Sequence, residues 1–299
     1  MATNPTPSPG SGVANFPLPR NLLQDDERRP WIAALPDIVK ELSDRWSIEE
    51  VGDPFQPGGQ SAWVAPVRLG DDLDLALKIA WRHTEAAHEA AGLRVWDGEG
   101  AVKLHASATP GDSIALLIER CIPGTNLGGR PEVDQDVVIA ELLHRLWGAQ
   151  PSGPFRPLQL MCDQWADEFE VKVEAGMGRL DRGLARDGIE LFRSLPATAD
   201  RRVLLCTDLH AENVLTAQRE PWLVIDPKPY VGDPTYDAVQ HMLNCEERLT
   251  ADPRGLSFRM ADLLAVDSER LMLWLFARCV QESPESPMLG EVARRIAPS

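Results

Sequence analysis

Two short apolar runs that each lead to an aspartate constrain the fold of this 299-residue chain more than any other feature. Residues 203–205 (Val-Leu-Leu) precede a polar segment that holds Asp208 and Asn213, and residues 222–225 (Trp-Leu-Val-Ile) end at Asp226. Short apolar runs bounded by polar residues are typical of buried strands. We therefore expect two strand ends that present two carboxylates and one carboxamide.

The spacing of these polar residues indicates phosphoryl transfer. An Asp, an Asn five residues later and then an Asp at a strand end form the reaction centre of kinases of the protein-kinase type. In that arrangement Asp208 accepts the proton of the attacking hydroxyl, while Asn213 and Asp226 hold Mg²⁺ through hard oxygen ligands. The alternative is that each residue only forms a turn by bonding its own backbone.

A lysine within an aliphatic segment is the second candidate feature. Lys78 lies in Ala-Leu-Lys-Ile-Ala, inside the alternating segment 73–81 that predicts a strand. It resembles the lysine of the Val-Ala-Ile-Lys strand in kinases, which pairs with nucleotide phosphates. Alternatively, Lys78 belongs to an edge strand and extends its ammonium to water.

Such a lysine needs an acidic partner. A helix expected over residues 83–97, capped by Thr84, follows the strand and brings three candidates: Glu85, Glu89 and, beyond its end, Glu99. We prefer Glu89, because it lies one turn before the apolar Leu93 and can face inward.

Gly58 and Gly59 separate two strand-like segments. Glycines let a backbone approach a phosphate closely, although an ordinary hairpin turn explains them equally well. No Gly-Lys-Ser/Thr follows, so this is not a Walker A loop.

Residues 101–106 and 113–119 predict two more strands, and the second exits into Pro123-Gly124. Beyond this point the composition becomes helical, which predicts a hinge whose exposed backbone can bind an adenine edge.

The resulting expectation is an α+β fold with two lobes. Residues 1–18, rich in Pro, Ser and Gly, predict a disordered tail. Residues 19–121 predict a small antiparallel sheet with a short helix that starts near Pro36, and residues 122–299 a larger, mainly helical lobe.

The composition limits the kinds of binding partner and cellular compartment that we expect for this chain. A net charge of −16 argues against nucleic acid and suits a cationic ligand. The five cysteines are scattered without a C-x-x-C pair, which argues for a reducing compartment and against zinc or a disulfide framework. With no signal-peptide layout and no long apolar run, we expect a soluble, cytoplasmic protein without a membrane partner.

Acidic residues of the second lobe are candidates for contact with a cationic acceptor. Asp163 and Asp167 lie four apart on an expected helix, and Glu212 lies beside Asn213. The alternative for the helix pair is a solvated face. Asp233, followed by Pro234, is a good N-cap for another helix.

Taken together, the motifs resemble the aminoglycoside phosphotransferase family of small-molecule kinases. Its streptomycin 6-phosphotransferase and hydroxyurea phosphotransferase branch is similar over three stretches: Leu93-Arg-Val-Trp-Asp-Gly-Glu-Gly-Ala-Val102, Leu117-Ile-Glu-Arg-Cys-Ile-Pro-Gly-Thr125 and Ile225-Asp-Pro-Lys-Pro-Tyr-Val-Gly-Asp-Pro-Thr-Tyr-Asp237. The similarity runs from about residue 45 to the end.

This resemblance implies a two-lobed protein-kinase-like fold and a role for each matched residue. Lys78 would bind the α- and β-phosphates of ATP, and Glu89 would orient it. The backbones of Glu119 and Cys121 would bind adenine. Asp208 would be the base and Asn213 and Asp226 the magnesium ligands. The implied supports of the catalytic loop are Asp237, which anchors it, and His210, which braces it.

Two departures from the family pattern stand out. The commoner motif begins His-Gly-Asp, whereas this chain has Cys206-Thr-Asp208. The glycine-rich loop is sparse, so GTP stays open beside ATP. The implied acceptor is an aminoglycoside such as streptomycin. Other sugars, amino sugars or hydroxyurea remain alternatives, as does a non-catalytic nucleotide-binding module, against which the intact residue set speaks.

Overall fold

A computed structural model describes residues 16–24, 26–70 and 73–298. The chain packs as two compact units, which we call the sheet unit (residues 1–87 and 104–120) and the helical unit (residues 88–103 and 121–299). Residues 88–103, which the sequence analysis placed in the first lobe, thus pack with the second.

The sheet unit is one five-stranded antiparallel sheet with one long helix. The strands follow the order β1-β2-β3-β5-β4, so β3 is central. The elements are α1 (Arg29–Trp46), β1 (Ile48–Val51), β2 (Ala62–Leu69), β3 (Leu73–Trp81), β4 (Leu104–Ala108) and β5 (Ser113–Glu119), with short 3₁₀ turns at Arg20–Gln24, Asp26–Arg28 and Ala86–His88.

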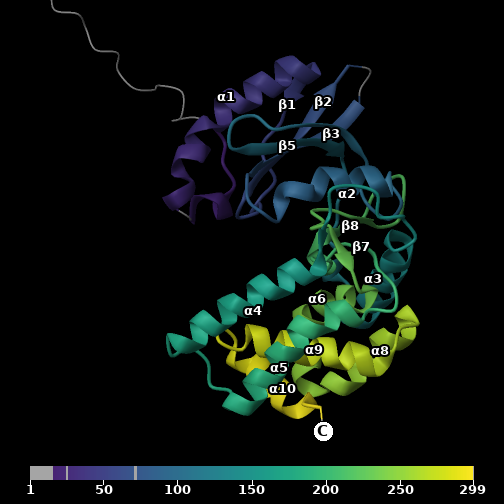
Figure 1. The fold of residues 1–299 in the computed structure, drawn as a ribbon. Coiled ribbons are helices and arrows are strands. Elements are labelled where there is room, and N and C mark those ends of the chain that lie inside the picture. The colour runs from purple at the N-terminus through teal and green to yellow at the C-terminus, as the bar shows by residue number, and fades with distance from the viewer. Residues whose placement is uncertain (1–15, 25, 71–72, 299) are drawn as a thin grey trace, which may run out of the picture. The chain divides into compact units, whose positions relative to one another are not determined.

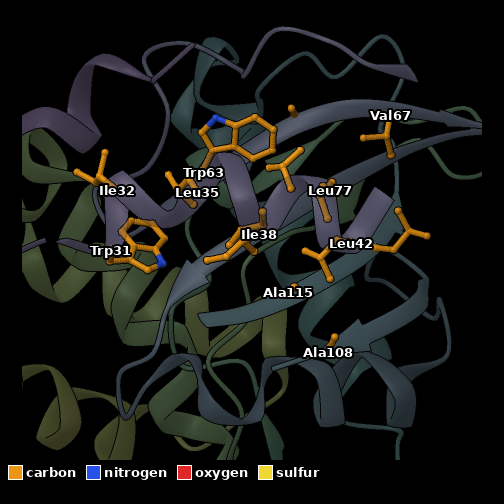
Figure 2. Close-up of a cluster of buried hydrophobic side chains, with 14 of the residues drawn as sticks. Trp31, Ile32, Leu35, Ile38, Leu42, Trp63, Val67, Leu77, Ala108 and Ala115 are labelled. Atoms are coloured by element: carbon orange, nitrogen blue, oxygen red, sulfur yellow. The ribbon is translucent and has the colours of Figure 1, made fainter. Parts of the chain in front are cut away.

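One face of the sheet packs against α1 (Figure 2). On β3 the alternating residues Leu75, Leu77 and Ile79 join this core, so Lys78 points to the opposite face.

The prediction that a helix starts near Pro36 was wrong, because α1 begins at Arg29 and continues through the proline. An internal proline costs about 3 kcal/mol. Burial of Trp31, Leu35 and Leu42 against the sheet outweighs this cost, at about 2 kcal/mol for each side chain.

The last residues of the predicted disordered tail are packed on the sheet unit. Phe16 stacks on Trp63 with ring centroids 5.4 Å apart, and the indole nitrogen of Trp63 donates to the carbonyl of Pro17 at 3.0 Å. The prediction therefore fails at residues 16–18, where an aromatic pair covers the core, and residues 1–15 lie outside the described part of the chain.

The helical unit is built around α9, which contacts α4, α5, α6, α8 and α10 (Figure 1). Its helices are α2 (Glu89–Trp96), α3 (Glu132–Leu146), α4 (Leu158–Glu174), α5 (Arg182–Ser194), α6 (Pro234–Asn244), α7 (Glu246–Ala251), α8 (Pro253–Leu264), α9 (Ser268–Glu282) and α10 (Pro287–Ile296). Within the described residues, no helix has the length and apolar character that a membrane crossing requires.

Short strands carry the polar loops of the helical unit. A three-stranded sheet has the order β6-β10-β7, formed by β6 (Arg156–Pro157), β10 (Tyr230–Gly232) and β7 (Val203–Leu205), and a hairpin joins β8 (Val214–Leu215) to β9 (Leu223–Val224).

Helix α2 is anchored in this unit and is shorter than predicted. It begins at Glu89 after a 3₁₀ turn, so Thr84 does not cap it. The indole nitrogen of Trp96 donates to the carbonyl of Leu146 at 3.2 Å. A Cβ added to Gly92 would lie 2.4 Å from Cγ of Pro229, so the helix backbone lies directly on the loop that precedes β10.

Candidate active site

Asn213 and Asp226 are brought together by a hairpin between β9 and β8, a strand that the sequence analysis did not predict, whereas the predicted strand β7 pairs with β10. Val214 of β8 pairs with Val224 of β9, and the amide of Ile225 donates to the carbonyl of Asn213 at 2.9 Å. Asn213 and Asp226 therefore lie next to each other, at the end of this hairpin. Asp208 follows β7 in the loop that leads to Asn213.

Asp237 holds the loop that carries Asp208. Its carboxylate accepts hydrogen bonds from the amides of Cys206 (3.0 Å) and Thr207 (2.6 Å) and from the indole of Trp147 (3.0 Å). Burial raises the pKa of Asp237 to about 6, although these hydrogen bonds oppose the shift. The side chain is completely buried, and its contacts are those of a structural anchor.

Thr207 occupies a position that suits glycine. Its φ of 54° is left-handed, a conformation that β-branched residues rarely adopt. Two hydrogen bonds hold it there: its amide donates to Asp237, and its hydroxyl donates to the carbonyl of Lys228 at 2.6 Å. The departure from the His-Gly-Asp pattern thus keeps the backbone geometry that glycine would favour.

The carboxamide of Asn213 is oriented by its nitrogen. Nδ2 donates to the carbonyl of Asp208 at 2.9 Å and to Nε2 of His210 at 3.1 Å, which turns the amide oxygen away from both partners. Burial lowers the pKa of His210, favouring the neutral ring that this acceptor role requires. His210 therefore supports the loop through Asn213.

Lys228 is a site residue that the sequence analysis missed. Its ammonium lies 3.2 Å from Oδ2 of Asp208 and 3.2 Å from Oδ1 of Asp226. Burial disfavours its charge, but Asp226, Asp208 and then Glu89 outweigh that effect and hold its pKa above the ordinary value. The signal was available, since Lys228 follows Asp226 by two residues in Asp-Pro-Lys.

Glu89 faces inward, with 1% of its surface exposed. The sequence analysis predicted this inward orientation from the position of Glu89 one turn before Leu93. Within the helical unit, the charge of Glu89 raises the pKa of Lys228.

Lys78 lies in the sheet unit with 6% of its surface exposed. Its strand neighbours are Val64 on β2 and Leu116 on β5, so β3 is flanked on both sides. The alternative of an edge-strand lysine was wrong, because strand order makes β3 central.

The four residues whose backbones were predicted to bind the nucleotide differ in conformation and burial. Gly58 has a φ of +75°, and an added Cβ would lie 2.4 Å from Cβ of Pro19. Packing within the sheet unit therefore requires the glycine, and neighbouring Gly59 is not in a left-handed conformation. Glu119 is the last residue of β5 and pairs with Leu75 of β3. Cys121 is half-buried and begins the second stretch of the helical unit.

The acidic residues predicted to meet the acceptor differ in their partners. Asp163 accepts from Gln159 at 2.9 Å, and Asp167 forms a 2.8 Å ion pair with Arg193 of α5. Glu212 is exposed beside Asn213, with its backbone carbonyl bound by Asn126 at 2.8 Å. Only Glu212 of the three belongs to the loop that carries Asp208 and Asn213.

Asp233 has the capping role predicted for it. Oδ1 accepts from the amide of Thr235 at 3.0 Å, while Oδ2 accepts from Arg270 at 2.5 Å and from Trp274 at 2.7 Å. These contacts tie the start of α6 to α9.

The antiparallel sheet of one unit and the helices of the other define a protein of the protein-kinase-like fold class. Solved structures that share this fold include two kinases. Choline kinase LicA from Streptococcus pneumoniae has a TM-score of 0.59 at 15% identity, covering 88% of this chain and 97% of that one. The amicoumacin kinase hAmiN, in complex with AMP-PNP, Ca²⁺ and Ami, has a TM-score of 0.58 at 14% identity, covering 90% and 95%.

Sequence comparison narrows the class to one family. The family model for aminoglycoside/hydroxyurea antibiotic resistance kinases matches residues 45–285, and the chain belongs to this family. A streptomycin 6-kinase of Streptomyces griseus is 34% identical, over 86% of this chain and 85% of its own length. A hydroxyurea phosphotransferase of Kitasatospora aureofaciens is also 34% identical, over 89% and 77%.

Proposed function

We propose that this chain is a cytoplasmic, ATP-dependent phosphotransferase that acts on a hydroxyl of an aminoglycoside, with streptomycin as the first candidate. The observation that carries the proposal is the grouping of Asp208 and Asp226 around one ammonium, with Asn213 beside Asp226. This set matches the base and metal ligands of protein-kinase-type phosphoryl transfer.

In the proposed reaction the acceptor oxygen attacks the γ-phosphorus of ATP, and the bond to the β–γ bridging oxygen breaks to release ADP. Asp208 orients the hydroxyl and takes its proton. Little covalent chemistry is required of the protein, so positioning and charge neutralisation supply most of the rate. Lys78 of the sheet unit would pair with the nucleotide phosphates.

The residues present fit a magnesium ion. Asp226 offers a carboxylate, and the hydrogen bonds of the Asn213 nitrogen leave its amide oxygen facing elsewhere. Mg²⁺ prefers such hard oxygen donors in small number, completed by phosphate oxygens and water. When bound, the ion would supply charge neutralisation at the phosphates, held by Asn213 and Asp226.

The acceptor is inferred from charge and from the relatives. A net charge of −16 favours a cationic molecule such as streptomycin, which carries guanidinium groups. Asp167 already binds the guanidinium of Arg193, so Glu212 is the better candidate for contact with the acceptor. Hydroxyurea is the second candidate acceptor, because a hydroxyurea phosphotransferase is equally identical in sequence.

An acceptor screen tests the proposal. The purified chain is incubated with γ-labelled ATP, Mg²⁺ and one acceptor at a time: streptomycin, hydroxyurea or a panel of amino sugars. We expect label to move to streptomycin, and parallel reactions with GTP establish the nucleotide preference. Transfer to hydroxyurea alone would shift the assignment to the second candidate, and absence of transfer to every acceptor would contradict the proposal.

A further inference from the structure

The backbone of Lys228 is fixed on both sides of the peptide unit. Its amide donates to the carbonyl of Cys206 at 2.9 Å, and its carbonyl accepts from the hydroxyl of Thr207 at 2.6 Å. The next residue, Pro229, lies against Gly92 of α2. The ammonium can therefore move only by rotation of its own side chain.

The charges around this ammonium are unequal in number. Asp208 and Asp226 place two carboxylates within 3.2 Å of one lysine ammonium, whose side chain is 17% exposed. Like charges at such distances repel one another unless a cation lies between them. A divalent cation at Asp226 would therefore compete with the ammonium for this carboxylate, while Lys228 could keep its contact with Asp208.

The two carboxylates have separate tasks in the proposed reaction. Asp208 receives a proton and Asp226 binds the metal ion, so a fixed spacing between them is useful before either ligand arrives. Lys228 bridges them with equal distances of 3.2 Å. It binds Oδ2 of Asp208, which leaves Oδ1 for the acceptor hydroxyl.

We propose that Lys228 is a positioning residue that bridges the base and the metal-binding carboxylate until a divalent cation displaces its ammonium from Asp226. The ammonium then remains on Oδ2 of Asp208 and keeps Oδ1 directed at the acceptor. This inference rests on the proposed function for the identity of the reaction. Its competition with the metal is a property of the cluster alone.

The competition predicts a gain of metal affinity when the charge is removed. Lys228→Met keeps most of the length of the side chain and deletes the ammonium, so it should bind Mn²⁺ alone about tenfold more tightly than the wild type. Lys228→Arg keeps the charge and should bind Mn²⁺ like the wild type. Lys172→Met is the matched control, since it removes an equal charge at the Glu285 pair on the surface.

The experiment measures Mn²⁺ binding to the full chain by electron paramagnetic resonance, without nucleotide or acceptor. Thermal denaturation first confirms that each variant is folded. Unchanged or weaker Mn²⁺ affinity in Lys228→Met, an equal gain in Lys172→Met, or no Mn²⁺ binding by any protein would each overturn the proposal.

Kinetics supply the second readout. Because Lys228 is proposed to act on the position of Asp208, Lys228→Met should lower kcat about a hundredfold and leave KM for ATP within about threefold. A higher KM at unchanged kcat would overturn the positioning role. If the wild type transfers phosphate to no acceptor, the proposed function fails, while the Mn²⁺ measurement still decides the competition.

Discussion

Thr207 combines an unfavourable backbone with two favourable hydrogen bonds, in contact with both the anchor and the lysine of the site. Strain of this kind costs on the order of 1–3 kcal/mol and persists only where its surroundings enforce it. The family motif has glycine here, for which the same φ carries no steric cost. The residue that differs from the motif therefore preserves its geometry.

Substitution of Thr207 separates strain from hydrogen bonding. Thr207→Gly removes the strain and the hydrogen bond of the hydroxyl but keeps that of the backbone amide, so we expect the free energy of unfolding to change by less than about 1 kcal/mol. Thr207→Val keeps the strain and loses the hydroxyl that binds the Lys228 carbonyl, and should destabilise by about 2 kcal/mol. Urea denaturation measures both. Equal losses for the two variants would contradict the assignment of strain to this residue.

Asp208 should be needed for turnover and not for nucleotide binding. Asp208→Asn keeps the shape but cannot take the acceptor proton, so kcat should fall on the order of a thousandfold. Calorimetry with a non-hydrolysable ATP analogue should give an affinity near that of the wild type. Asp187→Asn on α5, at an exposed pair with Arg186, is the control and should retain activity. Comparable turnover by Asp208→Asn would exclude the base role.

Some residues of the candidate site could be predicted from the sequence and others could not. Asp208, Asn213 and Asp226 were identified because their spacing along the chain carries the pattern. Lys228 was not, because its role depends on the carbonyl of Cys206 and the hydroxyl of Thr207, which are remote in sequence. Its position two residues after Asp226 is a local signal, but that spacing does not reveal contacts with residues remote in sequence.

At the scale of elements, helix α2 rests on the loop of the site through a glycine. A Cβ added to Gly92 would lie 2.4 Å from Cγ of Pro229, which is too close for any side chain at this position unless α2 or the loop shifts. Gly188 of α5 makes a similar contact, with Cγ2 of Val280 on α9 at 2.5 Å, far along the chain from the site loops.

The two glycines make a matched pair. Each change to Ala should cost about 1–3 kcal/mol of stability through overpacking, reduced by the better helix propensity of Ala. Gly92→Ala should also lower kcat severalfold, because α2 must shift from Pro229 and carries Glu89 with it. Gly188→Ala should leave kcat unchanged. Unfolding in urea measures the loss of stability, and steady-state kinetics measure kcat. Equal kcat values for the two variants would contradict a role of α2 in positioning the reacting groups.

Element boundaries were predictable where the pattern was local. The strands at 73–81 and 113–119 have the predicted bounds, since alternation and turn residues define them. The helix that contains Pro36 was not predictable, because burial against the sheet outweighs the local cost of proline. The packing of residues 88–103 with the helical unit likewise depends on long-range contacts such as Trp96 with Leu146.

At the scale of the whole molecule, one buried carboxylate joins four helices of the helical unit. Asp136 of α3 is fully buried and accepts from His241 of α6 (3.0 Å), Arg248 of α7 (2.8 Å) and Arg259 of α8 (2.6 Å). Asp136, His241 and Cys245 bring possible metal-ligand atoms within 4.8 Å. The two guanidinium groups already satisfy the carboxylate, so the cluster is a structural ion network.

This network predicts how stability depends on pH. Burial alone would raise the pKa of Asp136, but hydrogen bonds from His241, Arg248 and Arg259 outweigh it and hold the pKa well below the ordinary value of 3.8. Because the folded pKa is depressed, the stabilisation is present above about pH 4 and is lost as pH falls below that value.

Asp136→Asn should therefore cost about 3 kcal/mol at pH 7, since it leaves buried partners without their counter-charge. The cost should shrink as pH falls from 4 to 2, as measured by urea unfolding across that range. Asp134→Asn, at an exposed pair with Arg130, is the control and should change stability by less than about 1 kcal/mol. A pH-independent difference between wild type and Asp136→Asn would contradict the depressed pKa.

Residues 88–103 pack with the helical unit although they lie between the two stretches of the sheet unit, and this affects how the protein can be divided into fragments. The sheet unit is made of two separate stretches of chain, so no single cut yields both halves whole. A fragment that starts at Cys121 would lack Trp96 and the backbone pairing of Val102 with Val224, and a fragment that ends at Arg120 would carry α2 without the surface it covers. Recombinant fragments should therefore respect the interleaving of the chain, by grafting the 88–103 segment onto the larger half.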